Sequence, residues 1–256
     1  MSDSARFALH RPELLGALVR GEDKIAALVK ESSVTVPARA TLVAANTDHQ
    51  FVYRLLKGWA GRTRLLPDGR HQFILVFLPG DLFAVKSMFI TRQTDAVVAI
   101  TDLVAERIDY RKLHNAYIAD SDVAMRCIWQ IVEEERRLHS WVVGLGQGSA
   151  EERVALLLID LRGRLILSKT IASDSLIYDM PLTQVELADH LGITAVHVSR
   201  VLKDFRDSGV VTVRDGRVTI VNLEMLARRA SALLDPYERA HPAYVGQQEA
   251  GSNEHS

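Results

Sequence analysis

The sequence predicts an α+β protein with an N-terminal, jelly-roll-like β-roll, a long dimerisation helix and a C-terminal winged helix-turn-helix. Short strand-forming runs fill 34–108, apolar residues recur at helical spacing over 110–145, and a helix, turn, helix and hairpin follow over 182–221. We therefore expect four segments, namely a β-roll domain with N-terminal helices (1–108), a dimerisation helix with a hinge (109–148), the winged module (149–235) and a disordered tail (236–256).

The N-terminal region combines short helices with strands. Residues 12–30 carry apolar side chains at helical spacing, which predicts one or two amphipathic helices. The turn Pro67-Asp68-Gly69 separates strand-like runs at 62–66 and 71–77, and this arrangement predicts a hairpin. Further strands are expected at 51–58 and 95–100, and a further turn at 79–81. Short strands at such spacing are typical of a β-sandwich or a small barrel.

One long helix is predicted from about Tyr110 to Leu145. Its positions from 121 to 145 alternate spacings of three and four residues, the seam of a coiled coil. The helix length and the charged flanks favour self-pairing into a homodimer, while packing on the chain's own barrel stays open as the alternative. The flanks are Glu133, Glu134, Arg136 and Arg137. The expected dimer interface consists of Ala124, Ile128, Ile131, Leu138, Val142 and Leu145.

A hinge is expected where this helix ends. Three glycines within 144–148 interrupt the helical pattern and would let one domain swing relative to the other. Ser149 and Glu152 then form a capping box, which predicts a new helix over 153–165. Residues 163–180 are expected to be a loop or a short connector.

The stretch from Leu182 onward predicts a helix-turn-helix with a wing. Thr183 and Glu186 form a second capping box, Gly192 supplies the positive φ of a tight turn, and Thr194 caps a second helix. The buried face of that second helix is expected to hold Val198, Val201, Leu202 and Phe205. Asp215-Gly216 between two β-branched runs is the strongest short-range hairpin signal. This layout is typical of modules that read DNA.

Composition sets limits on partners and compartment. The net charge of −1 means that DNA affinity must come from placed charges and helix N-termini rather than from overall basicity. The single Cys127 excludes an intramolecular disulfide, which indicates a reducing compartment. No apolar run approaches the roughly 20 residues that span a bilayer. We expect a cytoplasmic protein without a membrane partner.

The motifs, taken in order, resemble the Crp/Fnr family of bacterial transcription regulators over roughly residues 30–225. The resemblance rests on Lys57-Gly58, the turn 67–72, the motif 78–81, the stretch from Gly146 to Arg153, and the winged module. It implies that the β-roll binds an effector, that paired long helices transmit its state, and that a homodimer reads an inverted-repeat operator in double-stranded DNA. For an activator it also implies a contact with RNA polymerase, which no motif here identifies.

The effector is not identified by the sequence. Members that bind cyclic AMP carry an Arg-Ser pair where this chain has Thr94-Asp95, and an aspartate would repel a cyclic phosphate. An iron-sulfur cluster needs four cysteines, so the single Cys127 argues against one. Nine histidines leave haem open. For Cys127, a packed buried thiol is favoured over a redox switch, and both readings stay open.

The expected base contacts lie in the first turns of the second helix, at Ala195, Val196, His197, Ser199 and Arg200, after the cap Thr194. Arg200 can donate two hydrogen bonds to guanine. The alternative role for Arg200 is a surface ion pair with Asp204, four residues further along the helix. Val196 offers an apolar contact, for instance to a thymine methyl, and His197 a contact to a base or phosphate. The expected phosphate contacts are Thr183 and Arg214 or Arg217.

Two other classes of function remain as rivals. A metal-dependent enzyme on a β-roll needs clustered ligands such as two histidines and a carboxylate, whereas His49 and His71 lie far apart in the sequence. We therefore expect neither an enzyme nor a metal site. The second rival is a dimeric ligand-binding or scaffold protein that has lost DNA binding, against which Arg200 and the intact wing argue.

Overall fold

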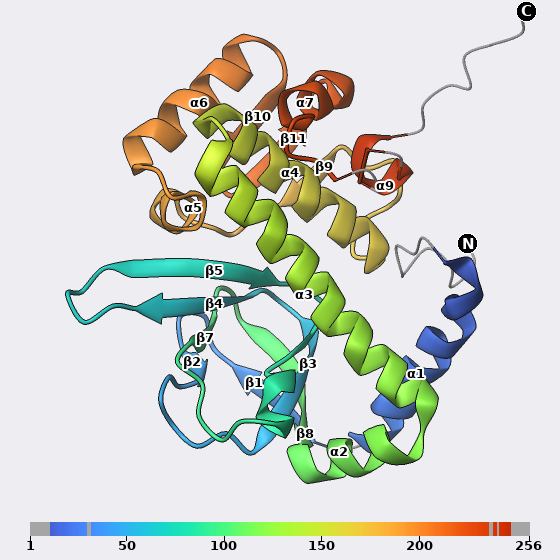
Figure 1. Ribbon diagram of the computed structural model, residues 1–256. Coiled ribbons are helices and arrows are strands. Elements are labelled where there is room, and N and C mark those ends of the chain that lie inside the picture. Colours follow the sequence, from blue (N-terminus) through green and yellow to red (C-terminus); the bar gives the residue numbers. More distant parts are fainter. Residues whose placement is uncertain (1–10, 30–31, 236–237, 240, 247–256) are drawn as a thin grey trace, which may run out of the picture. The chain divides into compact units, whose positions relative to one another are not determined.

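The computed structural model describes residues 11–29, 32–235, 238–239 and 241–246 (Figure 1). The chain divides into two compact units. The first comprises residues up to His139 together with Pro181–Gly192, and the second comprises Ser140–Met180 and residues from Ile193 onward. In the described residues, no helix combines the length and the apolar character that crossing a membrane requires.

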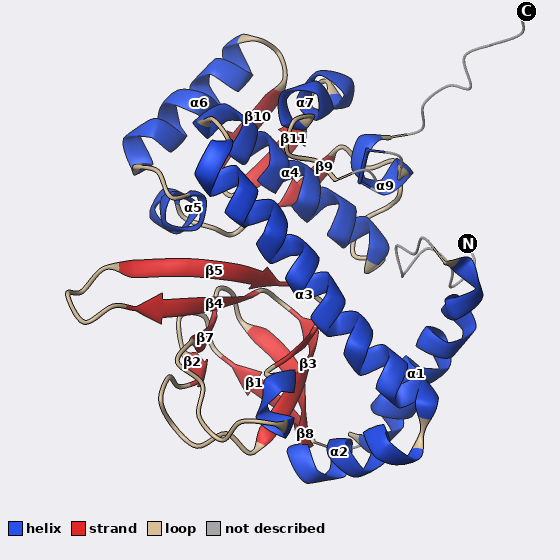
Figure 2. Cartoon of the chain, in the orientation of Figure 1, coloured by secondary structure: helices blue, strands red, loops and turns tan. Residues whose placement is uncertain are grey.

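Two four-stranded antiparallel sheets form a β-roll in the first unit. Figure 2 draws the strands in red. One sheet has the order β1 (Ser33–Val36), β8 (Leu103–Asp109), β3 (Phe51–Lys57) and β6 (Leu82–Phe83). The other has the order β2 (Thr41–Val43), β7 (Ala96–Ala99), β4 (Ala60–Leu65) and β5 (His71–Phe77). The predicted α+β class with an N-terminal β-roll is confirmed.

The predicted hairpin and turn are both present in the roll. Strands β4 and β5 are antiparallel neighbours, and Leu65 pairs with His71 next to the turn. Gly69 in that turn has a φ of 88°, a conformation open to glycine without steric cost. At the second turn, the Asp81 carboxylate accepts a hydrogen bond from the Leu78 amide at 2.8 Å. A short 3₁₀ helix, η3 (Val85–Met88), follows.

The core of the roll lies between the two sheets. The ring of Phe83 stacks on Tyr53 with centroids 5.3 Å apart and on Phe77 with centroids 5.0 Å apart. The other buried members are Val43, Leu55, Ala60, Ala84, Val97, Ala99, Leu103 and Ala105. Each fully buried large apolar side chain stabilises the fold by about 1.5–3 kcal/mol, so this cluster holds the two sheets of the roll together.

A second apolar cluster joins three helices to the roll. The helices are α1 (Leu15–Leu28), which follows the 3₁₀ turn η2 (Pro12–Leu14), α2 (Tyr110–Ala119) and α3 (Ser121–Gln147). Ile25 of α1 and Cys127 of α3 both belong to this cluster and are fully buried.

The prediction of one helix from Tyr110 to Leu145 is wrong, because the helix is interrupted at Asp120. This residue has extended φ and ψ of −137° and 116°. Its carboxylate accepts hydrogen bonds from the amides of Asp122 at 3.0 Å and Val123 at 3.3 Å. The side chain of Asp120 therefore caps α3 and separates it from α2.

The expected interruption of the helical pattern at the glycines of 144–148 also needs correction. Helix α3 continues past Gly144 and Gly146 to Gln147. A glycine inside a helix costs about 1 kcal/mol relative to alanine, which a helix of this length can absorb. The next helix, α4 (Ala150–Leu167), begins at the predicted capping box, in which the Glu152 amide donates to the Ser149 hydroxyl at 3.2 Å.

The second unit holds α4, α6 (Ala195–Asp207), α7 (Leu223–Ala230) and a three-stranded sheet. The sheet order is β10 (Val211–Arg214), β11 (Arg217–Ile220) and β9 (Ile177–Asp179). The connector predicted over 163–180 is therefore wrong in two respects, since α4 extends to Leu167 and β9 is a strand. A three-residue strand shows no alternation of its own, and β9 exists because it pairs with β11.

Part of the C-terminal segment is ordered. Helix α9 (Pro242–Val245) packs on α4, with Tyr244 fully buried against Gly163. The Arg162 guanidinium donates to the Ala243 carbonyl oxygen at 2.8 Å. The prediction of disorder from 236 onward is therefore wrong for 241–246, while 247–256 lie outside the described residues.

Helix α5 (Gln184–Leu191) packs on strand β5 in the first unit. The Gln72 side chain donates to the Asp189 carbonyl oxygen at 2.6 Å. The buried His190 places Nδ1 3.0 Å from the Phe73 carbonyl oxygen, and its ring meets the Phe73 ring edge to face. Because β5 lies at the edge of its sheet, these contacts cover part of an otherwise unpaired edge.

Candidate functional site

The predicted capping box and turn of the helix-turn-helix are present. The Thr183 hydroxyl accepts a hydrogen bond from the Glu186 amide at 3.2 Å, and the Glu186 carboxylate accepts from the Thr183 amide at 2.8 Å. Helix α5 then ends at Gly192, whose φ of 62° lies in the left-handed region. A residue with a Cβ would be strained there, so glycine allows the chain to turn directly into the next helix.

Thr194 caps helix α6, as predicted. The hydroxyl of Thr194 accepts a hydrogen bond from the His197 amide at 3.2 Å, which satisfies one of the unpaired donors of the first turn. Val198, Val201 and Phe205 are buried and hold α6 on the rest of its unit. The predicted buried face is confirmed for these three residues, and Leu202 is half-buried.

The opposite face of α6 points to solvent and carries the expected base-contacting side chains. Val196 is 61 % exposed, and His197, Ser199 and Arg200 are also exposed, whereas Ala195 is half-buried. Val196, His197 and Arg200 share one face because residues three and four apart are neighbours on a helix.

The alternative interpretation of Arg200 is not realised. Among the described residues, Arg200 forms no ion pair with Asp204, so its guanidinium is not committed to its own helix. Val196 places an apolar side chain in water beside it. Lys203, which the sequence pattern does not single out, is exposed on the same face of α6. The face therefore combines two cations with one apolar side chain.

The wing is the predicted type I′ hairpin. Asp215 and Gly216 both have positive φ, 49° and 72°, and Arg214 pairs with Arg217 across the turn. Both arginines are exposed, but Arg217 Nε donates to the Asp179 carboxylate at 3.0 Å. Asp179 belongs to β9, so this pairing follows from the strand that the sequence does not reveal. Arg214 is therefore the better placed of the two for a phosphate.

Helix α3 exposes a row of apolar side chains. Of the six predicted interface residues, Ile128, Ile131, Val142 and Leu145 are 43–66 % exposed, while Ala124 and Leu138 are half-buried. Two further exposed apolar residues, Val132 and Val143, fall outside the prediction because they lie one position off the expected seam. Water-exposed apolar residues in such number on one helix indicate a surface that binds another surface.

Two arginines of strand β4 in the β-roll form ion pairs with carboxylates of low exposure. Arg62 of β4 lies over the Phe77 ring and donates to the Glu134 carboxylate of α3 at 2.8 Å. Asp95 is buried and accepts from Arg64 at 2.6 Å. Among the described residues, no group of three or more His, Cys, Asp or Glu is placed to hold a metal ion.

Cys127 is fully buried in the cluster that joins α3 to the roll. Burial raises the pKa of the Cys127 thiol from its ordinary value of 9.0 to about 11, and Glu22 contributes in the same direction. The thiolate is the reactive form, so this environment favours an inert packed thiol over a redox switch.

Comparison with known proteins matches both parts of the chain. Residues 33–120 match the family model of the cyclic nucleotide-binding domain, and residues 152–229 match that of the Crp-like helix-turn-helix domain. A probable transcriptional activator of Rhizobium leguminosarum bv. viciae is 30 % identical over 201 residues, which cover 77 % of this chain and 80 % of that protein. The chain belongs to the Crp/Fnr family of bacterial transcription regulators.

One further relative and one solved structure are also similar to this Crp/Fnr protein. The transcriptional activator protein FnrL of Cereibacter sphaeroides is 29 % identical over 187 residues, covering 72 % of this chain and 74 % of FnrL. The structure of FixK2 from Bradyrhizobium japonicum has the same fold, with a TM-score of 0.69, 23 % identity and coverage of 77 % of this chain and 96 % of that one. Because residues 152–229 match the Crp-like helix-turn-helix domain, this member of the Crp/Fnr family is a DNA-binding transcription regulator.

Proposed function

We propose that this protein binds an inverted-repeat operator as a homodimer and regulates transcription through its β-roll. The observation that carries the proposal is the solvent-facing side of α6, where Val196, His197 and Arg200 project from a helix whose first turn is capped by Thr194. The N-terminal part of a recognition helix is the part that meets base edges in the major groove. A cap at that end keeps the first turn in a fixed conformation.

Each side chain of this face has a distinct role. Arg200 donates two hydrogen bonds to guanine, Val196 contacts a thymine methyl, and His197 contacts a base or a phosphate. Ala195 and Ser199 border these contacts. Outside α6, Thr183 and Arg214 bind phosphates, which fixes the register on the duplex without conveying sequence. Arg217 contributes only after releasing Asp179.

The dimer forms through the exposed apolar row of α3. Burying Ile128, Ile131, Val142 and Leu145 against the same residues of a second copy removes apolar surface from water, at about 25 cal/mol per Å². A two-fold dimer places two recognition helices in successive major grooves about 34 Å apart. The operator is therefore an inverted repeat.

Each expected segment of the chain has its own part in this function. Residues 1–108 sense, residues 109–148 dimerise and transmit, and residues 149–235 hold most of the DNA module. The capped junction at Ser149 between α3 and α4 is the place where a change in the first part would reorient the second. A cytoplasmic location and the absence of catalysis remain predictions of the sequence, and a contact with RNA polymerase remains an implication of the family resemblance for an activator.

The double variant His197→Ala, Arg200→Ala tests the proposal. We expect the wild-type chain to bind its best DNA site and the variant to lose most of that affinity, while both melt at the same temperature because neither side chain is buried. Unchanged affinity of the variant would favour the scaffold protein that no longer reads DNA through α6.

A further inference from the structure

Helix α3 carries a polar stripe that faces the β-roll. We define it as Arg126, Gln130, Glu134 and Arg137, spaced by four, four and three residues, and therefore on one side of the helix. Arg126, Gln130 and Arg137 are each at most 5 % exposed. Buried polar groups are expensive unless they are paired, so each buried member of the stripe needs a polar partner.

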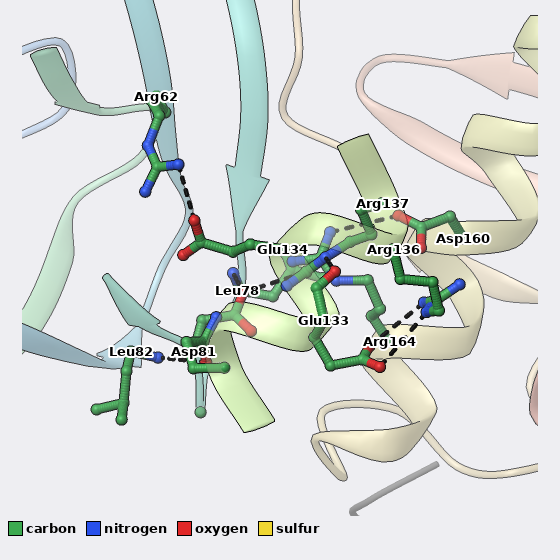
Figure 3. A network of polar contacts seen from close by, with 12 residues as sticks. Arg62, Leu78, Asp81, Leu82, Glu133, Glu134, Arg136, Arg137, Asp160 and Arg164 are labelled. Atoms are coloured by element: carbon green, nitrogen blue, oxygen red, sulfur yellow. Dashed lines mark hydrogen bonds and ion pairs between the residues drawn. The ribbon is translucent and has the colours of Figure 1, made fainter. Parts of the chain in front are cut away.

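Each member of the polar stripe contacts a group of the roll or of the turn between β5 and β6. Arg126 donates to the Gly80 carbonyl oxygen at 2.9 Å, and the Leu82 amide donates to the Gln130 side chain at 3.0 Å. Glu134 accepts from Arg62 at 2.8 Å, and Arg137 lies 3.9 Å from the Asp81 carboxylate. Figure 3 shows Arg62 and Glu134 pointing toward one another from β4 and α3.

A second carboxylate binds the other cations of this region. Asp95, just before β7, accepts from Arg64 Nε at 2.6 Å and lies 3.4 Å from Lys86 Nζ of η3. Arg64 also donates to the Thr94 hydroxyl at 2.8 Å. The Asp95 side chain is only 7 % exposed, while Arg64 and Lys86 reach it from the surface.

The less exposed cations of the roll are therefore already paired with carboxylates. In the described part of β1–β8, the cations that are not exposed are Arg54, Arg62 and Lys86, and each is paired with a carboxylate. An anionic ligand that entered here would have to displace Glu134 from Arg62 or Asp95 from Arg64 and Lys86. Either displacement leaves a carboxylate of low exposure without its cation, beside the incoming negative charge.

We propose that Asp95 and Glu134 act as built-in anions that close this β-roll to cyclic nucleotides, and that the polar stripe holds α3 on the roll without a ligand. The residues thus do not fit the ligand for which the matching family model is named. A cyclic phosphate carries one negative charge and needs an uncommitted cation or a set of donors, whereas Asp95 presents a carboxylate. If the proposed function also holds, operator affinity is independent of cyclic nucleotides.

The first test is a calorimetric titration of the full-length wild-type chain with cyclic AMP and with cyclic GMP. We expect no saturable binding of either up to about 1 mM, a concentration that reveals interactions of roughly 4 kcal/mol. Saturable binding of either nucleotide below that concentration would overturn the proposal. This readout does not involve DNA, so its failure is distinguishable from failure of the proposed function.

The second test asks whether the two carboxylates are the reason. Both substitutions remove a negative charge at nearly constant side-chain volume. Asp95→Asn frees Arg64 and Lys86 for an external anion, and Glu134→Gln frees Arg62. We expect inorganic phosphate to raise the melting temperature of these variants more than that of the wild type at equal ionic strength. The matched control is Glu135→Gln, an exposed neighbour on α3, which should behave like the wild type.

An equal phosphate response in wild type, control and both variants would show that Asp95 and Glu134 do not exclude anions, and the proposal would fail. If one variant does not fold, the other still decides, because the two carboxylates bind different cations. With operator DNA, 1 mM cyclic AMP should change the wild-type dissociation constant by less than about twofold. A tenfold change would contradict ligand-independent placement of α3.

Discussion

The hydroxyl of Thr194 and the backbone amide of His197 are joined by a 3.2 Å hydrogen bond at the start of α6. This contact connects the stability of the helix to its ability to present side chains, because the capped turn is the one that carries Val196 and His197. Substitutions at this cap, at Arg200, at the exposed apolar row of α3 and at Cys127 each have a measurable expected effect.

Replacing Thr194 with alanine removes the cap. We expect Thr194→Ala to lower the free energy of unfolding by about 1 kcal/mol, because one amide of the first turn loses its acceptor. Urea denaturation followed by circular dichroism measures the change. Thr194→Ser keeps the hydroxyl and should retain most of the stability; an equal loss in both variants would mean that the cap contributes nothing.

Replacing Arg200 with alanine should weaken operator binding by about 1–3 kcal/mol, roughly fivefold to 150-fold, and relax the preference for guanine at one position of each half-site. Fluorescence anisotropy with single-base operator variants measures both effects. The control is Arg206→Ala on the same helix, whose guanidinium is paired with Asp207 at 3.0 Å. Equal losses in the two variants would indicate a general charge effect instead of base recognition.

Replacing Ile128 and Ile131 with glutamate should dissociate the dimer. The two side chains are 43 % and 49 % exposed in one copy, and burying two carboxylates against a second copy is unfavourable. Sedimentation analysis should show monomers at concentrations at which the wild type is dimeric. Ile118→Glu on α2, at a position 70 % exposed and outside the row, should leave the dimer intact. A dimeric Ile128, Ile131 double variant would move the interface elsewhere.

Cys127 should be inert and should make stability fall at high pH. Because burial raises the pKa of its thiol, the folded state keeps the proton that the unfolded chain releases above about pH 9. Stability from this group is therefore complete below pH 9 and is lost as the pH rises toward 11. Denaturant titrations of the wild type and Cys127→Ala across this window measure the difference.

The same thiol gives an independent readout at neutral pH. Alkylation by iodoacetamide should be slow in the folded wild type and fast in denaturant, since both burial and the raised pKa of Cys127 suppress the thiolate. Rapid modification of the folded chain would show that Cys127 is accessible and would restore the redox interpretation.

The features that the sequence predicts best are local ones. The capping boxes at Ser149 and Thr183, the left-handed Gly192 and the Asp215-Gly216 turn depend on residues within a few positions of each other. Their side chains satisfy neighbouring amides, or their backbone adopts the conformation, whatever the rest of the chain does. The amino-acid sequence alone is therefore enough to locate the helix-turn-helix and its wing.

The features that the sequence does not reveal depend on distant partners. Strand β9 forms only because β11 pairs with it, 38 positions from Asp179 to Arg217, and it takes Arg217 out of the set of free wing charges. The sequence pattern places Glu134 and Arg137 on the flanks of a pairing helix, whereas they face Arg62 and Asp81 of the roll. Charge spacing along α3 alone does not distinguish these two outcomes.

Asp120 illustrates a different limit. Its side chain caps α3 through the amides of Asp122 and Val123, a local signal that is present in the sequence. The regular apolar spacing on both sides conceals it, because an aspartate is also tolerated on the exposed side of a helix. Similarly, the small and polar residues after 235 are typical of disorder, although Tyr244 finds a buried place beside Gly163.

A direct test of whether a dimer of this chain reads DNA through α6 is to select bound duplexes from a random DNA library. The selection uses the purified protein with no added ligand. We expect enrichment of an inverted repeat whose half-sites lie about one helical turn apart, near 34 Å. Arg200→Ala should lose the preference for one base in each half-site. No enrichment from a wild-type protein shown to be folded and dimeric would contradict DNA recognition by α6.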